Sequence, residues 1–138
     1  MRTAAALCVL AVAVAGCGAG ATDSSKKFNG EERAVARAVE DLEKAGRDRE
    51  EKTICSKLLA DTLLDALKKQ GTNCTTAVKE ALEDTDSFDL KVQDVVLSGP
   101  RARAKVESGR SGSSQKVDTL TLERDGSVWK IASLTATE

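Results

Sequence analysis

The spacing of apolar residues changes once along this chain, near Asp84, and that change limits the fold more than any other feature. Before it, apolar residues recur at steps of three and four; after it, they alternate with polar residues. The first pattern is typical of amphipathic helices and the second of strands with one buried face. The sequence therefore predicts an α+β domain over residues 29–138, with N-terminal helices packed on a curved four-stranded antiparallel sheet.

The first helix is predicted to begin after Asn29 and to end near Gly46. Asn29 is a good N-cap residue, and Glu32 stands three positions later, which is the spacing of a capping box. Phe28, just before the cap, is placed to act as a hydrophobic staple against the first turn. Glycine is a common residue at the end of a helix because it adopts the left-handed conformation freely.

A second helical stretch is predicted over 49–69 and a third over 74–83. The apolar residues of the second stretch lose their register near residue 60, which indicates a break there with Asp61 as a new cap. Asn73 or Thr72 is expected to cap the third helix.

Apolar and polar residues alternate over 88–93, 101–107, 120–122 and 128–134. Asp125-Gly126, between the last two of these segments, is a strong signal for a tight hairpin, because the favoured turns need positive φ angles. Short connections between successive strands predict a meander, in which each strand pairs with the next.

Residues 1–16 have the features of an export signal: one positive charge at Arg2, then an apolar run over 4–15 that is too short to span a bilayer. The run ends in Val14-Ala15-Gly16-Cys17, which resembles the lipobox of bacterial lipoproteins. The resemblance implies cleavage before Cys17 and a diacylglyceryl group on its sulfur. Two acyl chains anchor a protein firmly, whereas a single chain gives only marginal binding.

The expected location is the extracytoplasmic face of the cell membrane, with residues 17–28 forming the lipidated cysteine and a flexible tether. The segment 18–27 is small, polar and without hydrophobic pattern, which is typical of a linker. The alternative is ordinary signal cleavage, because Ala19-Gly20-Ala21 also fits the small-x-small pattern and would remove Cys17.

Cys55 and Cys74 stand 19 positions apart in the predicted helical region. In a chain exported from the cytoplasm, such a pair predicts a disulfide, which contributes about 3 kcal/mol on the chain-entropy estimate. A metal pair or a redox pair is the alternative. The spacing is not C-x-x-C and the chain has no His, and both facts weigh against that alternative.

Three helices followed by a sheet that closes on Trp129-Lys130-Ile131 resemble the cone-shaped fold of the nuclear transport factor 2-like (cystatin-like) superfamily. The stretch 54–59 (ICSKLL), followed by Cys74, a short helix and the sheet, resembles small actinobacterial lipoproteins of that superfamily. The resemblance covers about Gly30 to Leu134. It implies a cavity inside the cone, although the chain lacks the short strand pair that full-length members have between the second and third helices.

The superfamily includes ketosteroid isomerases, dehydratases and polyketide cyclases, which use Asp, His or Tyr inside the cone. This chain has no His and no Tyr, so Asp94 and Asp118 are the candidate catalytic bases, each in phase with apolar residues of its strand. A carboxyl group buried there would have a raised pKa and could accept a proton. The alternative is that both face water at strand ends, or that a bulge near Asp94 turns its side chain outward.

A non-catalytic binding or interaction module is the expected function, with a small isomerase-, dehydratase- or cyclase-type enzyme as the alternative. The formal net charge of −1 argues against nucleic-acid binding. Arg101, Arg103 and Lys105 form a positive stripe, expected to be solvated or to meet an acidic partner. The expected partner is another envelope protein or a small apolar ligand, with the chain a monomer or homodimer and without cofactor or metal.

Overall fold

The computed structural model describes residues 23–85, 88–109 and 115–136 of the chain. Within them, a short 3-10 turn and four helices, with a π-helical turn after the second, precede four strands. In chain order they are η1 (Ser25–Lys27), α1 (Gly30–Arg47), α2 (Glu51–Thr53), η2 (Ile54–Leu58), α3 (Asp61–Lys69), α4 (Cys74–Glu83), β1 (Leu90–Ser98), β2 (Arg101–Ser108), β3 (Lys116–Asp125) and β4 (Val128–Ala136).

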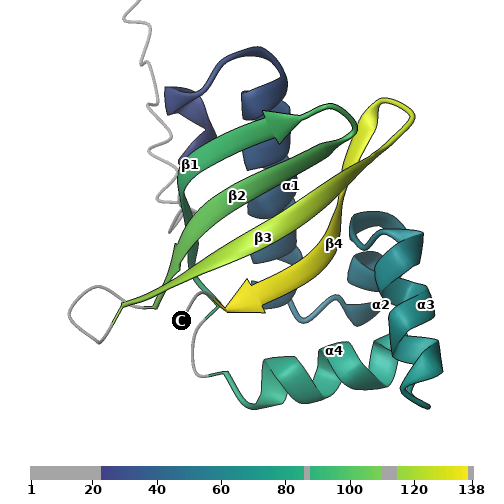
Figure 1. Ribbon diagram of the computed structural model, residues 1–138. Helices are drawn as coiled ribbons and strands as arrows, with labels where there is room; N and C mark the ends of the chain where they lie inside the picture. The colour runs from purple at the N-terminus through teal and green to yellow at the C-terminus, as the bar shows by residue number, and fades with distance from the viewer. Residues whose placement is uncertain (1–22, 86–87, 110–114, 137–138) are drawn as a thin grey trace, which may run out of the picture.

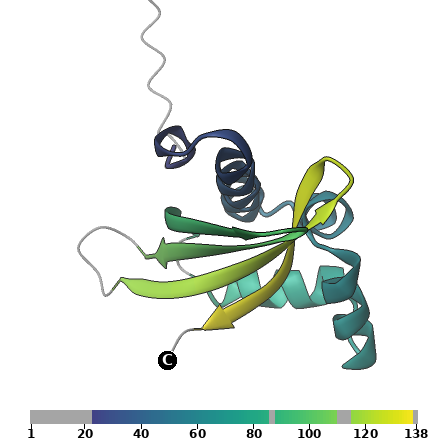
Figure 2. The same ribbon diagram turned by 45° about the horizontal axis from the view of Figure 1, so that its top comes forward.

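The four strands form one antiparallel sheet in the order β1-β2-β3-β4, so the predicted meander and the α+β class are confirmed. The turn between β3 and β4 contains Gly126 at φ +61°, the positive angle that the Asp-Gly signal predicts. Figures 1 and 2 show α1 lying across the sheet and α3 beside β4.

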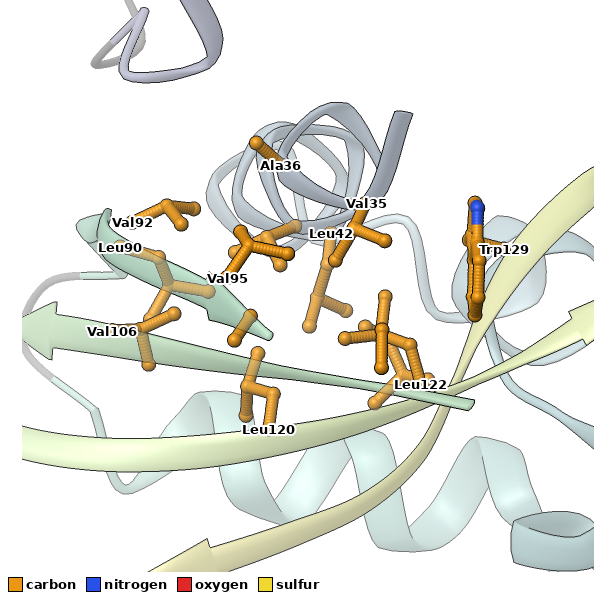
Figure 3. Close-up of a cluster of buried hydrophobic side chains, with 14 of the residues drawn as sticks. Val35, Ala36, Leu42, Leu90, Val92, Val95, Val106, Leu120, Leu122 and Trp129 are labelled. Carbon is orange, nitrogen blue, oxygen red and sulfur yellow. The ribbon is translucent and has the colours of Figure 1, made fainter. Parts of the chain in front are cut away.

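The core lies between α1 and the face of the sheet that points toward it, called here the inner face. Figure 3 shows aliphatic side chains from α1 meeting those of the strands, with Trp129 standing apart from them. On β2 the alternation is complete: Ala102, Ala104 and Val106 are buried, and the residues between them are exposed. A period of two therefore separates the two faces of the sheet, as the sequence predicts.

The helix α1 buries one face on the sheet through Val35, Val39 and Leu42. Asn29 is its N-cap, but the Asn29 side chain makes no capping hydrogen bond, so the predicted capping box does not form. The helix continues one residue past Gly46, and Gly46 packs against the Phe88 ring, so closely that an added Cβ would lie 2.3 Å from Phe88 Cδ1. Gly46 is required for this close approach.

The second helical stretch breaks where the sequence predicts, although Asp61 does not cap the new helix. Ala60 is the N-cap of α3, and its backbone N–H donates to Ile131 O at 2.8 Å. Leu59 and Ile131 also form an isolated parallel bridge. Pairing with β4 therefore fixes the start of α3, and it covers the outer edge of that strand.

The segment just before α1 covers the other edge of the sheet, at β1. Ser24 Oγ accepts a hydrogen bond from Val92 N at 3.1 Å, and Lys27 Nζ donates to Gln93 O at 2.9 Å. Ser25 is also buried, with its backbone N–H donating to Glu40 Oε1 at 2.7 Å. Ser24, Ser25 and Lys27, which composition assigns to the tether, are thus held on the domain by hydrogen bonds of the Ser24 hydroxyl, the Ser25 backbone N–H and the Lys27 ammonium group to β1 and α1.

Candidate functional site

An apolar cavity of about 280 Å³ lies at the side of the core where α3, α4 and β4 meet. Every residue that lines it carries a hydrocarbon side chain. They are Leu42, Ile54, Leu59, Leu63, Leu67, Ala77, Val78, Ala81, Leu82, Phe88, Leu90 and Ile131. No ionisable group is present in this lining, so the cavity can hold an apolar ligand but offers no catalytic acid or base.

The helix α4 forms one wall of the cavity and contacts α2, η2 and α3. Of its residues only Leu82 is fully buried, so little apolar packing holds it. Two other features fix its start: the disulfide between Cys55 and Cys74, with a Cα–Cα distance of 5.9 Å, and Asn73 Oδ1, which accepts from Thr76 N at 2.9 Å. Both the predicted disulfide and the predicted Asn73 cap are confirmed.

Asp94 lies on the exposed side of β1, away from the cavity. The register of β1 against β2 shifts between Val92 and Asp94, and Val95 is buried in the place that strict alternation gives to Asp94. This is the bulge that the sequence leaves open as an alternative. Asp94 is exposed and does not line the apolar cavity, so it is not positioned as a catalytic base.

Asp118 lies on the inner face of β3, opposite Val106, but it is not part of the cavity lining. Its side chain is 23% exposed, and Oδ1 lies 3.5 Å from Lys116 Nζ. Oδ1 is itself buried and accepts no hydrogen bond from the described residues. The carboxylate is therefore held near the inner face by an ion pair, outside the apolar cavity.

Glu43 is a buried carboxylate that sequence reasoning missed. It is fully buried on α1, and its Oε1 accepts from Arg47 Nη1 at 3.2 Å. Arg47 also lies 3.8 Å from Asp89 Oδ1, so the end of α1 is tied to the segment entering β1. The four-residue steps from Val35 through Val39 to Glu43 are the sequence signal that places this side chain on the buried side.

The positive stripe of Arg101, Arg103 and Lys105 lies exposed on the outer face of the sheet. Arg101 Nη2 pairs with Glu123 Oε1 at 3.2 Å across the β2–β3 register. Exposed pairs of this kind contribute little to stability.

Cys17 lies outside the described residues, so its lipidation remains a prediction. Across residues 23–85, 88–109 and 115–136, no helix is both long and apolar enough to cross a bilayer. Over the same residues, no group of three His, Cys, Asp or Glu side chains is placed to hold a metal ion.

Comparison with known protein families, with curated proteins and with solved structures gave no match for this chain. The site is therefore described by its chemistry alone. It is a hydrocarbon-lined cavity, with one wall fastened by a disulfide and the two candidate carboxylates outside it.

Proposed function

We propose that this chain is a membrane-anchored extracytoplasmic lipoprotein whose domain binds a small apolar ligand without catalysing a reaction. The observation that carries the proposal is the apolar cavity between α3, α4 and β4. Its volume of about 280 Å³ is close to the lower end of ligand pockets, roughly 300–1,000 Å³. Burying the surface of an apolar ligand in such a lining supplies the binding free energy, about 25 cal/mol per Å².

The proposed family is the nuclear transport factor 2-like superfamily. The order of helices before a four-stranded antiparallel meander supports this, as does a cavity between helices and the inner face. In the enzymes of that superfamily, acid–base groups stand inside the cone. Here the cavity lining carries only Leu, Ile, Val, Ala and Phe, which favours binding over proton transfer.

The anchoring half of the proposal rests on residues 14–17, and mass spectrometry of the membrane fraction tests it. The mature N-terminus is expected at Cys17 with a diacylglyceryl mass, and Cys17→Ser is expected to release the protein from the membrane. A mature protein whose N-terminus lies after Cys17 and carries no lipid would show ordinary signal cleavage, and it would contradict the proposed lipid anchor.

The binding half is tested with an uncharged apolar dye, N-phenyl-1-naphthylamine, added to the purified protein carrying Cys17→Ser. Saturable binding at one dye per chain is expected. Ala77→Phe fills the cavity from α4 and is expected to weaken dye binding about tenfold, since it displaces a ring-sized part of the ligand. Thr76→Phe, one residue earlier and exposed on the same helix, is the matched control. Absence of saturable binding, or equal affinity in both variants, would contradict the proposal.

A further inference from the structure

A second hollow of about 280 Å³ lies between α1, η2 and the turn that leads into β4. None of the residues that line it belongs to the apolar cavity. It is called here the α1 groove. Unlike the cavity, the α1 groove combines apolar and charged side chains, so it fits a different kind of ligand.

The floor of the α1 groove is apolar because of the spacing along α1. Gly30, Ala34 and Ala38 follow one another at four-residue steps, which places them in a row on one face of the helix. Their small side chains leave room between α1 and η2. Leu58 and Trp129 form further apolar surface, and this row of small residues spans about 12 Å at 1.5 Å per residue.

The rim of the α1 groove carries an excess of positive charge. Three cations line it, namely Arg33, Arg37 and Lys57, against a single carboxylate, Asp41. Arg33 is fixed in place, because its Nε donates to Phe28 O at 2.7 Å. Arg37 and Lys57 are exposed, so an anion can reach both.

Asp41 offsets only part of this charge. Partial burial and the neighbouring Glu40 raise the pKa of the Asp41 carboxyl, while Arg37 and Lys44 oppose that rise. With three cations against this one carboxylate, the lining of the groove keeps a net positive charge for an incoming anion.

We propose that the α1 groove binds a free single-chain amphiphile with one anionic head group. The head group pairs with Arg37 and Lys57, and the hydrocarbon chain lies on Ala34, Ala38 and Leu58. Glu32, an exposed carboxylate in the first turn of α1, repels an extended anionic surface, whereas Glu31 is paired with Arg124 at 3.3 Å. A small ligand that enters the groove avoids Glu32, which favours it over a bilayer.

Trp129 makes this proposal measurable. It is the only Trp of the chain, which has no Tyr, and it lines the α1 groove with its Nε1 donating to Glu31 Oε2 at 2.9 Å. Titration of the Cys17→Ser protein with decanoate is therefore expected to give a saturable change in tryptophan fluorescence. Decanol, with the same chain and no charge, is expected to bind at least about tenfold more weakly, because it cannot form the charge-assisted hydrogen bonds.

Charge-reversal variants complete the test. Arg37→Glu and Lys57→Glu are each expected to weaken decanoate binding about tenfold. Arg103→Glu, the same charge change on the outer face of the sheet, is the matched control and should leave binding unchanged. Ala77→Phe should also leave it unchanged, which separates the groove from the apolar cavity. Equal decanoate affinity in Arg37→Glu and Arg103→Glu, no saturable change, or binding only to phosphatidylglycerol vesicles would overturn the proposal.

Discussion

Gly46 and Phe88 show at the residue scale how one close contact shapes both the helix end and the cavity. Gly46 lies inside α1, where alanine would favour helix by about 1 kcal/mol. A Cβ there would lie 2.3 Å from Phe88 Cδ1 and 2.5 Å from Cε1. The steric overlap outweighs the helix propensity, because Phe88 is packed against the core and lines the cavity.

Gly46→Ala is therefore expected to lower the free energy of unfolding by about 1–3 kcal/mol, the usual cost of overpacking. Denaturant unfolding monitored by circular dichroism measures this loss. Combining it with Phe88→Ala should cost less than the sum of the two single changes, because the overlap is gone. A strictly additive double variant would show that the two residues do not interact.

Asp41 gives a prediction for pH dependence. The pKa of its carboxyl is raised in the folded protein, chiefly by burial and then by Glu40. The folded state therefore binds the proton more tightly than the unfolded state, and stability falls as pH rises above the ordinary pKa of an Asp carboxyl.

Asp41→Asn is expected to stabilise the protein at neutral pH by about half a kcal/mol or less, since the residue is largely exposed. The gain should disappear below about pH 4, where the native carboxyl is protonated in both states. Urea unfolding at two pH values measures this. A gain that grows on acidification would contradict the assigned direction of the shift.

Much of the site at the residue scale was readable from the sequence, and the exceptions have physical causes. The Cys55–Cys74 pair and the Asn73 cap followed from residue type and spacing. The Asp94 side chain does not face the same side of β1 as Leu90 and Val92, because a bulge interrupts the alternation. The bulge depends on how β1 pairs with β2, which spacing along one strand does not encode. Glu43 was missed because a charged residue is rarely fully buried.

At the scale of elements, α4 depends on its disulfide more than on packing. Replacing Cys55 and Cys74 by Ser is expected to lower the free energy of unfolding by about 3 kcal/mol, as loop-closure entropy returns to the unfolded chain. Chemical denaturation measures the loss, and reduction of the native protein should reproduce it. Hydrogen exchange should quicken first in α4, where only Leu82 is fully buried.

The edge of β1 yields a second prediction for an element. Ser24→Ala removes the acceptor of the buried Val92 N–H, and leaving such a donor unsatisfied costs about 1–3 kcal/mol. Faster amide exchange at Val92 and a lower melting temperature are expected. Ser56→Ala, at an exposed hydroxyl that donates to Lys52 O within one helical stretch, is the matched control. Equal effects of the two changes would show that Ser24 does not protect β1.

Element boundaries were the part of the fold that the sequence predicted least well. Periodicity located α1, the break before α3 and all four strands. It placed the cap of α3 at Asp61, yet the helix start is set by Ala60 pairing with Ile131, a contact 71 positions away in the chain. The sequence also places Ser24 within the predicted tether, although Ser24 is bonded to β1. Hydroxyl side chains are equally suited to linkers and to bonding an edge strand, so composition does not separate the two.

At the scale of the whole molecule, each edge of the sheet is bonded by a preceding segment at one place, β1 at Val92 and Gln93 by Ser24 and Lys27, and β4 at Ile131 by Ala60. Uncovered edges are the usual route to pairing between chains. The outer face carries Arg101, Arg103 and Lys105, and such charge disfavours burial against a second copy.

The Cys17→Ser protein is therefore expected to be a monomer, which sedimentation velocity measures over a range of concentrations. A dimer that persists on dilution would contradict this expectation. The overall topology was predictable because a meander needs only short connections. The packing position of α4 was not predictable, and neither was the cavity that α4 lines, because both depend on contacts between side chains distant in sequence.

The docking of residues 24–27 against β1 has a mechanical consequence for a lipid-anchored chain. If Cys17 carries the acyl chains as proposed, seven residue steps from Cys17 to Ser24 separate the bilayer from the packed domain, a linker of at most about 25 Å. A force on this linker would act on β1, the edge strand to which Ser24 and Lys27 are bonded. The domain would then stay within this distance of the lipid surface.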